Sequence, residues 1–469
     1  MSLDLHAPGF DFTPLHDFRE RLLAHEAAQR LLDTFLAACK THGWIKPRGT
    51  QRTDSTHVLA AVRRLYSLEC VQEALRHALN QLREVNAPWV HQHVPVAWYE
   101  RYGPRAEVGR FPQEARQRAA LALQSGVDGY PLLEWLGADA PADDRRRRPA
   151  VEVLRPMGGQ HYSRCTVPGL ATLRWRSPDE QPPAALLMQS PYDVDTRSSQ
   201  KRETQWVGSK VHLSETCDVG QPEVMTQVSP TLATTSDCVM GPVIQDDFAA
   251  RALLPGTHLV DRGSVVADVL VRAQTHHQID VVGPPLSSSS RQQRDGHGYD
   301  LHAFVIDWEA QPAQCPQGQR RVKGTAGKRP TGESVLRIRF DRATCRACPT
   351  RQAWTSSPEA PRQLTVKPQG YHEARQATPE FRAQYALRAG VESTRSQAVR
   401  RLDVRQSRSI GLARTHLQQV LTATAMNIVR VIDWLRGKPL GEKKRPAGHF
   451  ARLVPDPLAI GALATAGGT

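Results

Sequence analysis

The chain has 469 residues, of which 40% are hydrophobic, and it carries a formal net charge of +14. This length and apolar content suffice for one large domain with insertions or for a few smaller domains. The positive charge favours a polyanionic partner, most commonly nucleic acid. Because no apolar run is long enough to span a bilayer and no signal-peptide pattern is present, we expect no membrane contact and a cytoplasmic protein.

Helical patterns alternate with loops in the first 180 residues. Residues 14–40 place apolar side chains on one face among charges, which predicts helix. A turn then leads to Asp54, and residues 58–82 again predict helix, so Asp54 is expected at a junction. The stretch that follows is predicted to hold a Pro-rich loop at 94–99, a helix at 112–125 and an exposed linker at 141–149.

From residue 205 strands and helices alternate. The predicted strands are 206–213, 223–228, 257–261 and 279–283, with helices at 243–254 and up to 275. This order indicates an α/β fold. It places Asp261 at the C-terminal end of a strand, where open α/β sheets build their sites.

The C-terminal part is predicted to return to helix. Residues 287–298 suggest a loop and 301–365 a small β-rich insertion, and helices follow from 379 to 436. The last helix is expected to end at Gly437 and Pro439. Its apolar spacing predicts a buried face made of Ile410, Leu417, Leu421, Ala425, Ile428, Ile432 and Leu435.

Tyr385, Arg388 and Glu392 lie at i, i+3 and i+7 of a predicted helix and therefore share one face. A carboxylate on such a stripe can ligate a divalent metal while its neighbours bind a phosphodiester. With Asp54 and Asp261 it would complete a set of three carboxylates for two-metal chemistry.

Each carboxylate also has a structural alternative. Asp54 would serve as an N-cap, Asp261 could cap the helix after its strand, and Glu392 could form a surface ion pair with Arg388. Asp193 and Asp195, just before the predicted strands, are rival candidates for the first carboxylate.

Basic residues strongly outnumber acidic ones between 381 and 450. Their clustering beside a predicted phosphodiester site favours contact with a DNA backbone over a simple solvated face. The candidates for DNA contact are Tyr385, Arg388, Arg395, Arg400, Arg401, Arg405, Arg408 and Arg414.

Five blocks of the chain resemble, in the same order, blocks of the DDE transposases of bacterial insertion sequences. They begin at Arg52, Gly208, Phe304, Arg388 and Ile410. The resemblance covers residues 8–450. It implies a ribonuclease-H-like α/β fold with a mixed sheet, an apparently shortened N-terminal region, and metal-dependent cutting and joining of element ends.

The same resemblance implies the site and its partners. The catalytic and metal-binding triad would be Asp54, Asp261 and Glu392, holding two Mg²⁺ ions for which Mn²⁺ can substitute. Double-stranded DNA would be the partner, and a homodimer on DNA is expected by analogy. The protein would be bacterial and associated with the nucleoid. Two other functions share these residues: a catalytically silent DNA-binding remnant, and a metal-dependent nuclease without strand transfer.

The resemblance also suggests a domain organisation. A helical N-terminal segment would span 1–50, and the first part of the catalytic domain 51–285 with an insertion at about 84–182. A β-rich Cys-containing insertion would follow at 286–370, then the helical part of the catalytic domain at 371–450 and a flexible tail at 451–469.

Three of the eight cysteines, Cys315, Cys345 and Cys348, lie in turn-forming segments typical of a zinc ribbon. A structural zinc site needs four ligands, and the resemblance places the fourth cysteine at Trp354. Unless His372 or another residue substitutes, the site is incomplete, so we expect reduced thiols and no bound zinc.

Overall fold

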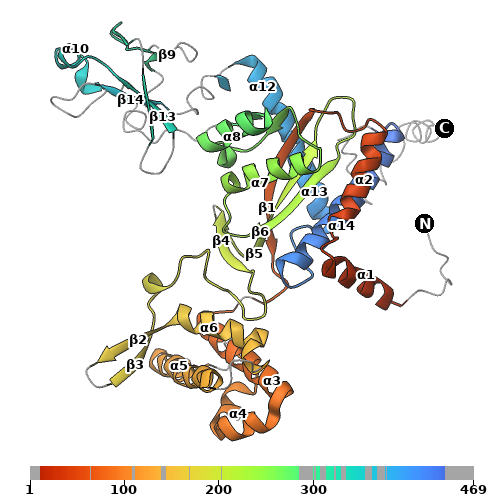
Figure 1. The fold of residues 1–469 in the computed structure, drawn as a ribbon, viewed down its shortest axis with the longest axis vertical. Coiled ribbons are helices and arrows are strands. Elements are labelled where there is room, and N and C mark those ends of the chain that lie inside the picture. The colour runs from red at the N-terminus through yellow and green to blue at the C-terminus, as the bar shows by residue number, and fades with distance from the viewer. Residues whose placement is uncertain are drawn as a thin grey trace, which may run out of the picture.

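The computed structural model describes residues 11–438 with gaps. The gaps are residues 64, 108–110, 139–143, 168–169, 202, 285–298, 300–302, 307–312, 322–323, 329–333, 354–361, 367–374 and 377. Figure 1 shows a central sheet flanked by helices, a group of helices below it and a small β-rich part at the upper left. The predicted loop at 287–298 and the predicted tail at 451–469 lie outside the described residues.

The central sheet is mixed and has six strands. They are β1 (Thr50–Leu59), β4 (Arg197–Lys201), β5 (Thr204–Thr216), β6 (Met225–Leu232), β7 (Thr257–Leu259) and β8 (Asp280–Val282). β1 is antiparallel to β5 and parallel to β7, β7 is parallel to β8, and β5 also pairs with β4 and β6. The predicted α/β class is confirmed, and the mixed sheet is consistent with a ribonuclease-H-like fold.

Helices cover both faces of this sheet. They are α2 (Arg30–Thr41), α7 (Asp237–Ala250), α8 (Ala267–His277), α12 (Pro379–Ala386), α13 (Gly390–Leu402) and α14 (Leu412–Leu435), with the short turns η4 (Arg262–Ser264) and η7 (Leu387–Ala389). Arg52 and Asp54 of β1 point to the face covered by α13. Thr53 points to the other face, where its hydroxyl contacts His258 of β7. β1 therefore has a polar side chain on each face, which only tertiary partners can satisfy.

The helix predicted at 58–82 is wrong in its first part, because β1 continues to Leu59 and α3 (Ser67–His93) begins only at Ser67. The Pro-rich loop predicted at 94–99 is also wrong, since α4 (Val96–Tyr102) occupies it and buries Trp98. The helix expected at 112–125 is longer, running as α5 (Ala115–Ala138). In the predicted linker, η2 (Asp144–Arg147) precedes α6 (Pro149–His161).

Helices α3 to α6 and the hairpin of β2 (Tyr162–Val167) and β3 (Leu170–Trp175) pack around a core of their own. That core includes Leu75, Leu82, Leu132, Leu136 and Met157, all fully buried. This helical unit enters the chain between β1 and β4, the first two strands of the central sheet. The domain limits proposed from the sequence remain predictions.

The β-rich part contains two three-stranded sheets. Their strands are β9 (Val305–Ile306), β10 (Ala313–Gln314), β11 (Arg320–Arg321), β12 (Thr325–Lys328), β13 (Ser334–Arg339) and β14 (Gln363–Val366), with α10 (Arg342–Arg346) between the last two. Cys315, Cys345 and Cys348 line one cavity of about 340 Å³ in this part. Trp354 and His372, the expected or substitute fourth ligands, lie outside the described residues.

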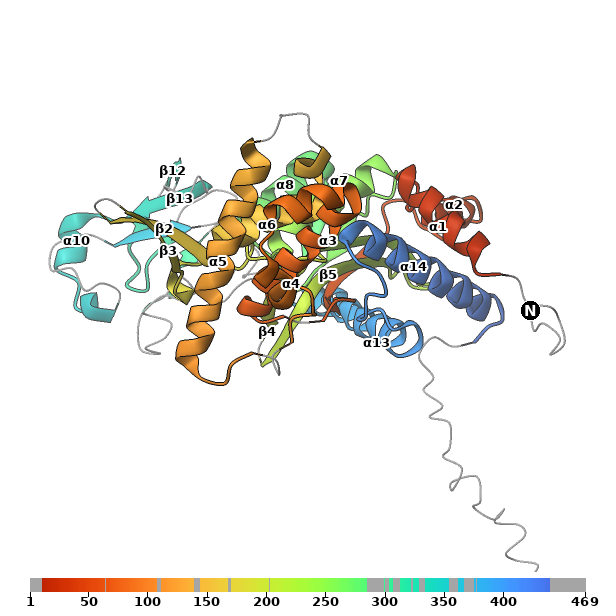
Figure 2. The same ribbon diagram turned by 90° about the horizontal axis from the view of Figure 1, so that it is seen from below.

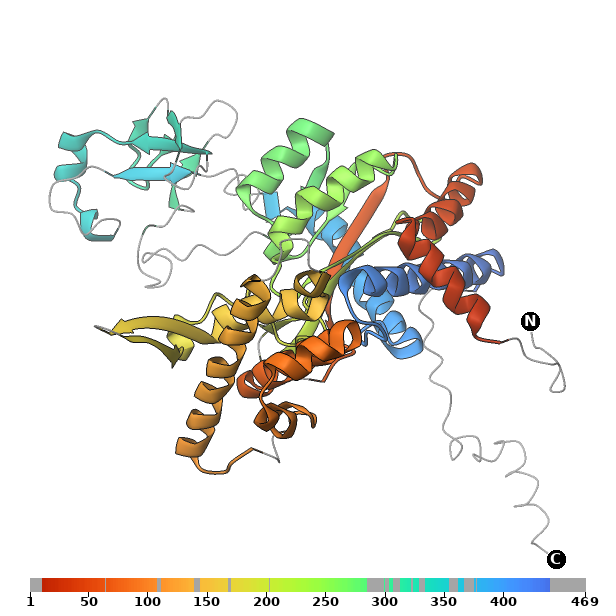
Figure 3. The same ribbon diagram turned by 60° about the horizontal axis from the view of Figure 1, so that its bottom comes forward.

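The predicted N-terminal helical stretch forms two helices, α1 (Thr13–Ala24) and α2, which lie against α14 (Figures 2 and 3). The buried face predicted for α14 is wrong. Only Leu417 of the predicted set is buried, and the other six residues are exposed. The buried face instead carries Val420, Ala423, Met426, Asn427, Arg430 and Val431. Within the described part of the chain, no helix is long and apolar enough to cross a membrane.

Candidate active site

Two of the predicted carboxylates, Asp54 and Asp261, lie near each other where β1 pairs with β7. Arg52 of β1 is in register with Leu259 of β7, and the two strands are parallel. Asp54 and Asp261 each follow this pair by two residues. β7 ends at Leu259, but the charge of Asp261 acts on the pKa of Asp54, so the two carboxylates lie near each other. Neighbouring strands are about 4.8 Å apart. The pairing of β1 with β7 thus brings together two aspartates that are far apart in the sequence.

Asp54 lies in the middle of β1, which excludes the alternative of a helix N-cap. Its carboxylate is buried and is bound by two arginines: Arg388 Nη2 donates to Oδ1 at 3.1 Å, and Arg395 Nη1 donates to Oδ2 at 2.9 Å. Burial raises the pKa of Asp54 above its usual value, and the two guanidinium groups act against this rise. The negative charge of Asp261 raises it further.

Asp261 lies two residues after Leu259, the last residue of β7, so the strand ends slightly before its predicted end at residue 261. Its Oδ1 accepts a hydrogen bond from the Ser264 hydroxyl at 3.2 Å, and its side chain makes no capping bond to the backbone. The next α-helix begins at Ala267 with Val266 as its N-cap residue. The helix-capping alternative for the Asp261 side chain is therefore not what the structure shows.

Glu392 lies in the first turn of α13. Arg388 precedes it by four residues and Arg395 follows it by three, so the three side chains leave the chain on one stripe. Both arginines reach Asp54, which places this stripe over β1. The Glu392 side chain is exposed and makes no hydrogen bond or ion pair with the residues that the structure describes. The alternative role of Glu392, a surface ion pair with Arg388, is not what the structure shows, because Arg388 pairs with Asp54.

Tyr385 is at the end of α12, half-buried against Phe381 at a ring-centroid distance of 6.0 Å. Burial raises the pKa of Tyr385, and the charges of Asp261 and Asp54 add to this effect while Arg388 opposes it. The phenol thus lies within electrostatic range of both aspartates and remains protonated at neutral pH.

The rival aspartates have another role. Asp195 Oδ2 accepts a hydrogen bond from the backbone N–H of Leu412 at 2.9 Å, and Asp193 Oδ2 accepts one from Gly411 at 3.3 Å. Both carboxylates therefore bind the N-terminus of α14, where a negative charge is favourable. The structure brings neither of them to Asp54 and Asp261.

The basic residues after Glu392 divide into two groups. Arg395 binds Asp54, and Arg405 Nε donates to the Thr56 hydroxyl at 2.9 Å, so both line β1 beside the site. Arg400, Arg401 and Arg408 are exposed, and Arg414 forms an exposed ion pair with Glu20. The sequence indicated Arg395 as a DNA contact but did not show its pairing with Asp54.

The donor set fits a hard divalent cation, because such ions prefer carboxylate oxygens. Asp54 and Asp261 lie near each other where β1 pairs with β7, and Glu392 lies on the helix that covers β1. The guanidinium groups of Arg388 and Arg395 now supply the positive charge that a cation would bring to Asp54. Among the described residues, no group of three or more His, Cys, Asp or Glu side chains already converges on a metal position.

Comparison with known proteins supports one family. Residues 314–432 match a family model described as a transposase DDE domain, and this match supports a DDE transposase family. The matched stretch contains Tyr385, Arg388, Glu392 and Arg395 but not Asp54 or Asp261. No curated protein matches the chain.

Proposed function

We propose that the protein is a DDE transposase, which cuts the DNA ends of a mobile element and joins them to target DNA with Mg²⁺ or Mn²⁺. The proposal is supported chiefly by the parallel pairing of β1 with β7, which brings Asp261 close enough to Asp54 for their charges to interact, beneath the helix of Glu392. The family match over the C-terminal part supports it independently.

Asp54, Asp261 and Glu392 would hold two divalent ions, which when bound activate water and stabilise the leaving 3′-oxygen. Arg388 and Arg395 hold the Asp54 carboxylate in the free protein. A guanidinium binds carboxylate and phosphate with the same geometry, so either arginine can transfer from Asp54 to a phosphodiester. The protonated Tyr385 hydroxyl can donate to a phosphate oxygen.

The DNA duplex would extend from this site over the exposed arginines. Arg400, Arg401, Arg408 and Arg414 offer charges to successive phosphates, which predicts a steep dependence of binding on salt. Two element ends must be brought together for transposition, so a homodimer on DNA is part of the proposal.

The test is an assay of the purified protein on duplexes carrying the sequences that flank its coding region. The wild type is compared with Glu392→Gln and Asp261→Asn, and with Asp268→Asn as a matched control at an exposed position of α8. Metal-dependent nicking and joined products should disappear in the first two variants and persist in the control. Nicking without joined products would identify a nuclease, and salt-sensitive binding without cleavage would identify a catalytically silent DNA-binding protein.

A further inference from the structure

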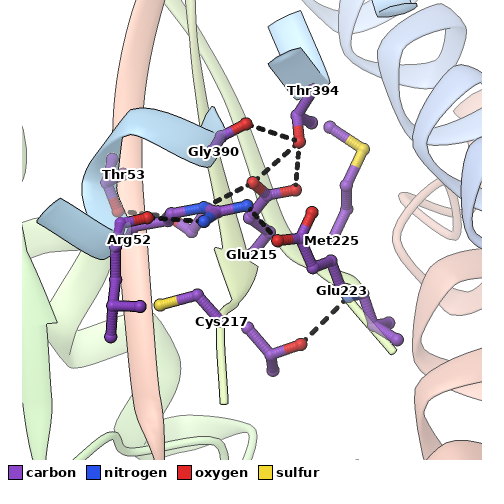
Figure 4. Close-up of polar contacts among 12 residues, drawn as sticks. Arg52, Thr53, Glu215, Cys217, Glu223, Met225, Gly390 and Thr394 are labelled. Carbon is purple, nitrogen blue, oxygen red and sulfur yellow. Dashed lines mark hydrogen bonds and ion pairs between the residues drawn. The ribbon is translucent and has the colours of Figure 1, made fainter. Parts of the chain in front are cut away.

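A buried ion-pair network lies between β1 and the helix that carries Glu392 (Figure 4). At its centre, Glu215 of β5 accepts from Arg52 Nε and from Arg430 Nη1, both at 2.7 Å. The Thr394 hydroxyl approaches both oxygens of Glu215 at 2.8 and 2.7 Å. Glu215, Arg52, Thr394 and Arg430 are 1–5% exposed. We call these four residues the Glu215 network.

Arg52 connects this network to the chain just before Glu392. Its Nη1 donates to the Leu387 carbonyl oxygen at 2.6 Å, and its Nη2 forms an ion pair with Glu223 at 2.7 Å. A Cβ atom on Gly390 would lie 2.2–2.5 Å from the Arg52 guanidinium. Only glycine therefore allows the start of α13 to lie directly on Arg52.

The residues that Arg52 and Glu215 contact lie on both sides of Glu392 in the sequence. Leu387 and Gly390 precede it, and Thr394 follows it by two residues. On the sheet side, Arg52 precedes Asp54 by two residues on the same strand and the same face. The Glu215 network thus joins the two elements that must bring Asp54 and Glu392 together.

Stability alone does not explain such a network. A buried ion pair loses so much hydration that apolar residues of the same volume often stabilise a fold equally well. Directional bonds to fixed partners do, however, restrict the position of a helix more narrowly than apolar packing does.

We propose that the Glu215 network is the positioning element that holds Glu392 at a fixed place relative to Asp54. This inference rests on the proposed function, because it assigns the network to the metal-binding carboxylates. Arg52, Glu215, Thr394 and Arg430 are positioning residues, since none of them would touch metal or DNA. They would fix the position of Glu392 indirectly, because they hold the backbone from Leu387 to Thr394 in place.

Two variants alter the network without removing a charge. Thr394→Val keeps the side-chain shape and removes the hydroxyl, and Thr394→Ser restores a hydroxyl as the conservative rescue. Gly390→Ala pushes the start of α13 away from Arg52. Its matched control is Gly159→Ala, at a helical glycine where a Cβ would meet nothing within 4 Å.

The full-length protein is tested by two measurements. Hydrogen exchange of the α13 amides reports how firmly the helix is held, and titration with Mn²⁺ reports the geometry of the carboxylates. In Thr394→Val and Gly390→Ala, exchange in α13 should become faster and Mn²⁺ affinity should fall by about 10-fold or more, the usual effect of losing a residue that orients metal ligands. Thr394→Ser and Gly159→Ala should match the wild type in both.

The remaining outcomes contradict the inference in distinguishable ways. Faster exchange with unchanged Mn²⁺ affinity would show that the network only fastens the helix, and unchanged exchange would show that it does not hold α13 at all. If the wild type binds no Mn²⁺, or binds it as well as Asp261→Asn does, the proposed function is overturned and the positioning role with it.

Discussion

Asp54 is the residue on which the proposed metal site depends most. In the free protein two guanidinium groups bind its carboxylate, although the negative charge of Asp261 is close enough to act on it as well. Both arginines lie on the helix stripe of Glu392. A cation that binds Asp54 must therefore compete with Arg388 and Arg395, and DNA phosphates can draw the arginines away. This competition predicts that DNA and metal bind with positive coupling.

Removing one of these arginines should favour the metal in the absence of DNA. We expect Arg395→Gln to tighten Mn²⁺ binding by about fivefold, because a partly exposed ion pair contributes at most about 1 kcal/mol. Calorimetric titration measures this change. The control is Arg400→Gln, at an exposed position of the same helix, which should leave the affinity unaltered. Weaker binding in Arg395→Gln would show that the arginine does not compete with the cation.

At the level of elements, the sequence predicted the regular parts of the sheet and failed at β1 and α14. The strands near 206–213, 223–228, 257–261 and 279–283 are confirmed because their apolar alternation is local. β1 carries polar side chains on both faces, and the partners of Arg52 and Asp54 are far away in sequence. No local pattern shows that Glu215 will pair with Arg52.

α14 shows the same limitation. Its apolar spacing selected Leu421, Ile428 and Ile432, all of which are exposed. The buried face includes Asn427 and Arg430, polar residues that are satisfied only by long-range partners. Asn427 Oδ1 accepts from the Met225 N–H at 2.7 Å, and its Nδ2 donates to the Met225 carbonyl at 2.9 Å. The side chain of Asn427 thus forms with Met225, the first residue of β6, the two hydrogen bonds that a neighbouring strand would otherwise form.

Truncation of this side chain should be costly. Asn427→Ala leaves the N–H and C=O of Met225 buried without partners, which costs about 1–3 kcal/mol for each such group. We expect the free energy of unfolding in urea to fall by roughly 2–6 kcal/mol. In the neighbouring exposed position, Ile428→Ala should lower it by less than about 1 kcal/mol. Equal effects of the two substitutions would contradict the observed orientation of α14.

At the level of the whole molecule, the sheet core and the helical unit each contain a fully buried histidine that stays neutral. Burial lowers the pKa of His258 in the sheet to about 4, and it does the same to His161 in the helical unit. The imidazole of His258 contacts the Thr53 hydroxyl at 2.7 Å, and His161 stacks on Trp175 at 5.1 Å. Both parts of the molecule should therefore lose stability in acid.

The direction of this pH dependence follows from the pKa of the histidine in the unfolded and in the native state. In the unfolded chain histidine titrates near pH 6.5, so between pH 6.5 and 4 the unfolded state binds more protons than the native state. The free energy of unfolding is therefore highest above pH 6.5, and it falls as the pH is lowered towards 4. For His258 the loss amounts to roughly 2–3 kcal/mol at pH 4.5.

Urea unfolding at pH 7.0 and 4.5 measures this loss. His258→Gln should reduce the difference between the two pH values, whereas His16→Gln, at an exposed position of α1, should not. The same acid sensitivity in both variants would mean that His258 is not held neutral in the native state.

We propose that Asp54, Asp261 and Glu392 hold the same divalent ions, and metal-directed cleavage of the chain can test this proposal. With Fe²⁺ in place of Mg²⁺, ascorbate and peroxide generate hydroxyl radicals that cut the backbone only beside the bound ion. We predict cuts close to residues 54, 261 and 392 together, suppressed by excess Mg²⁺ and absent in Asp261→Asn. Cuts near Asp193 and Asp195, or the absence of any cut that Mg²⁺ suppresses, would show that these three carboxylates do not share a bound metal.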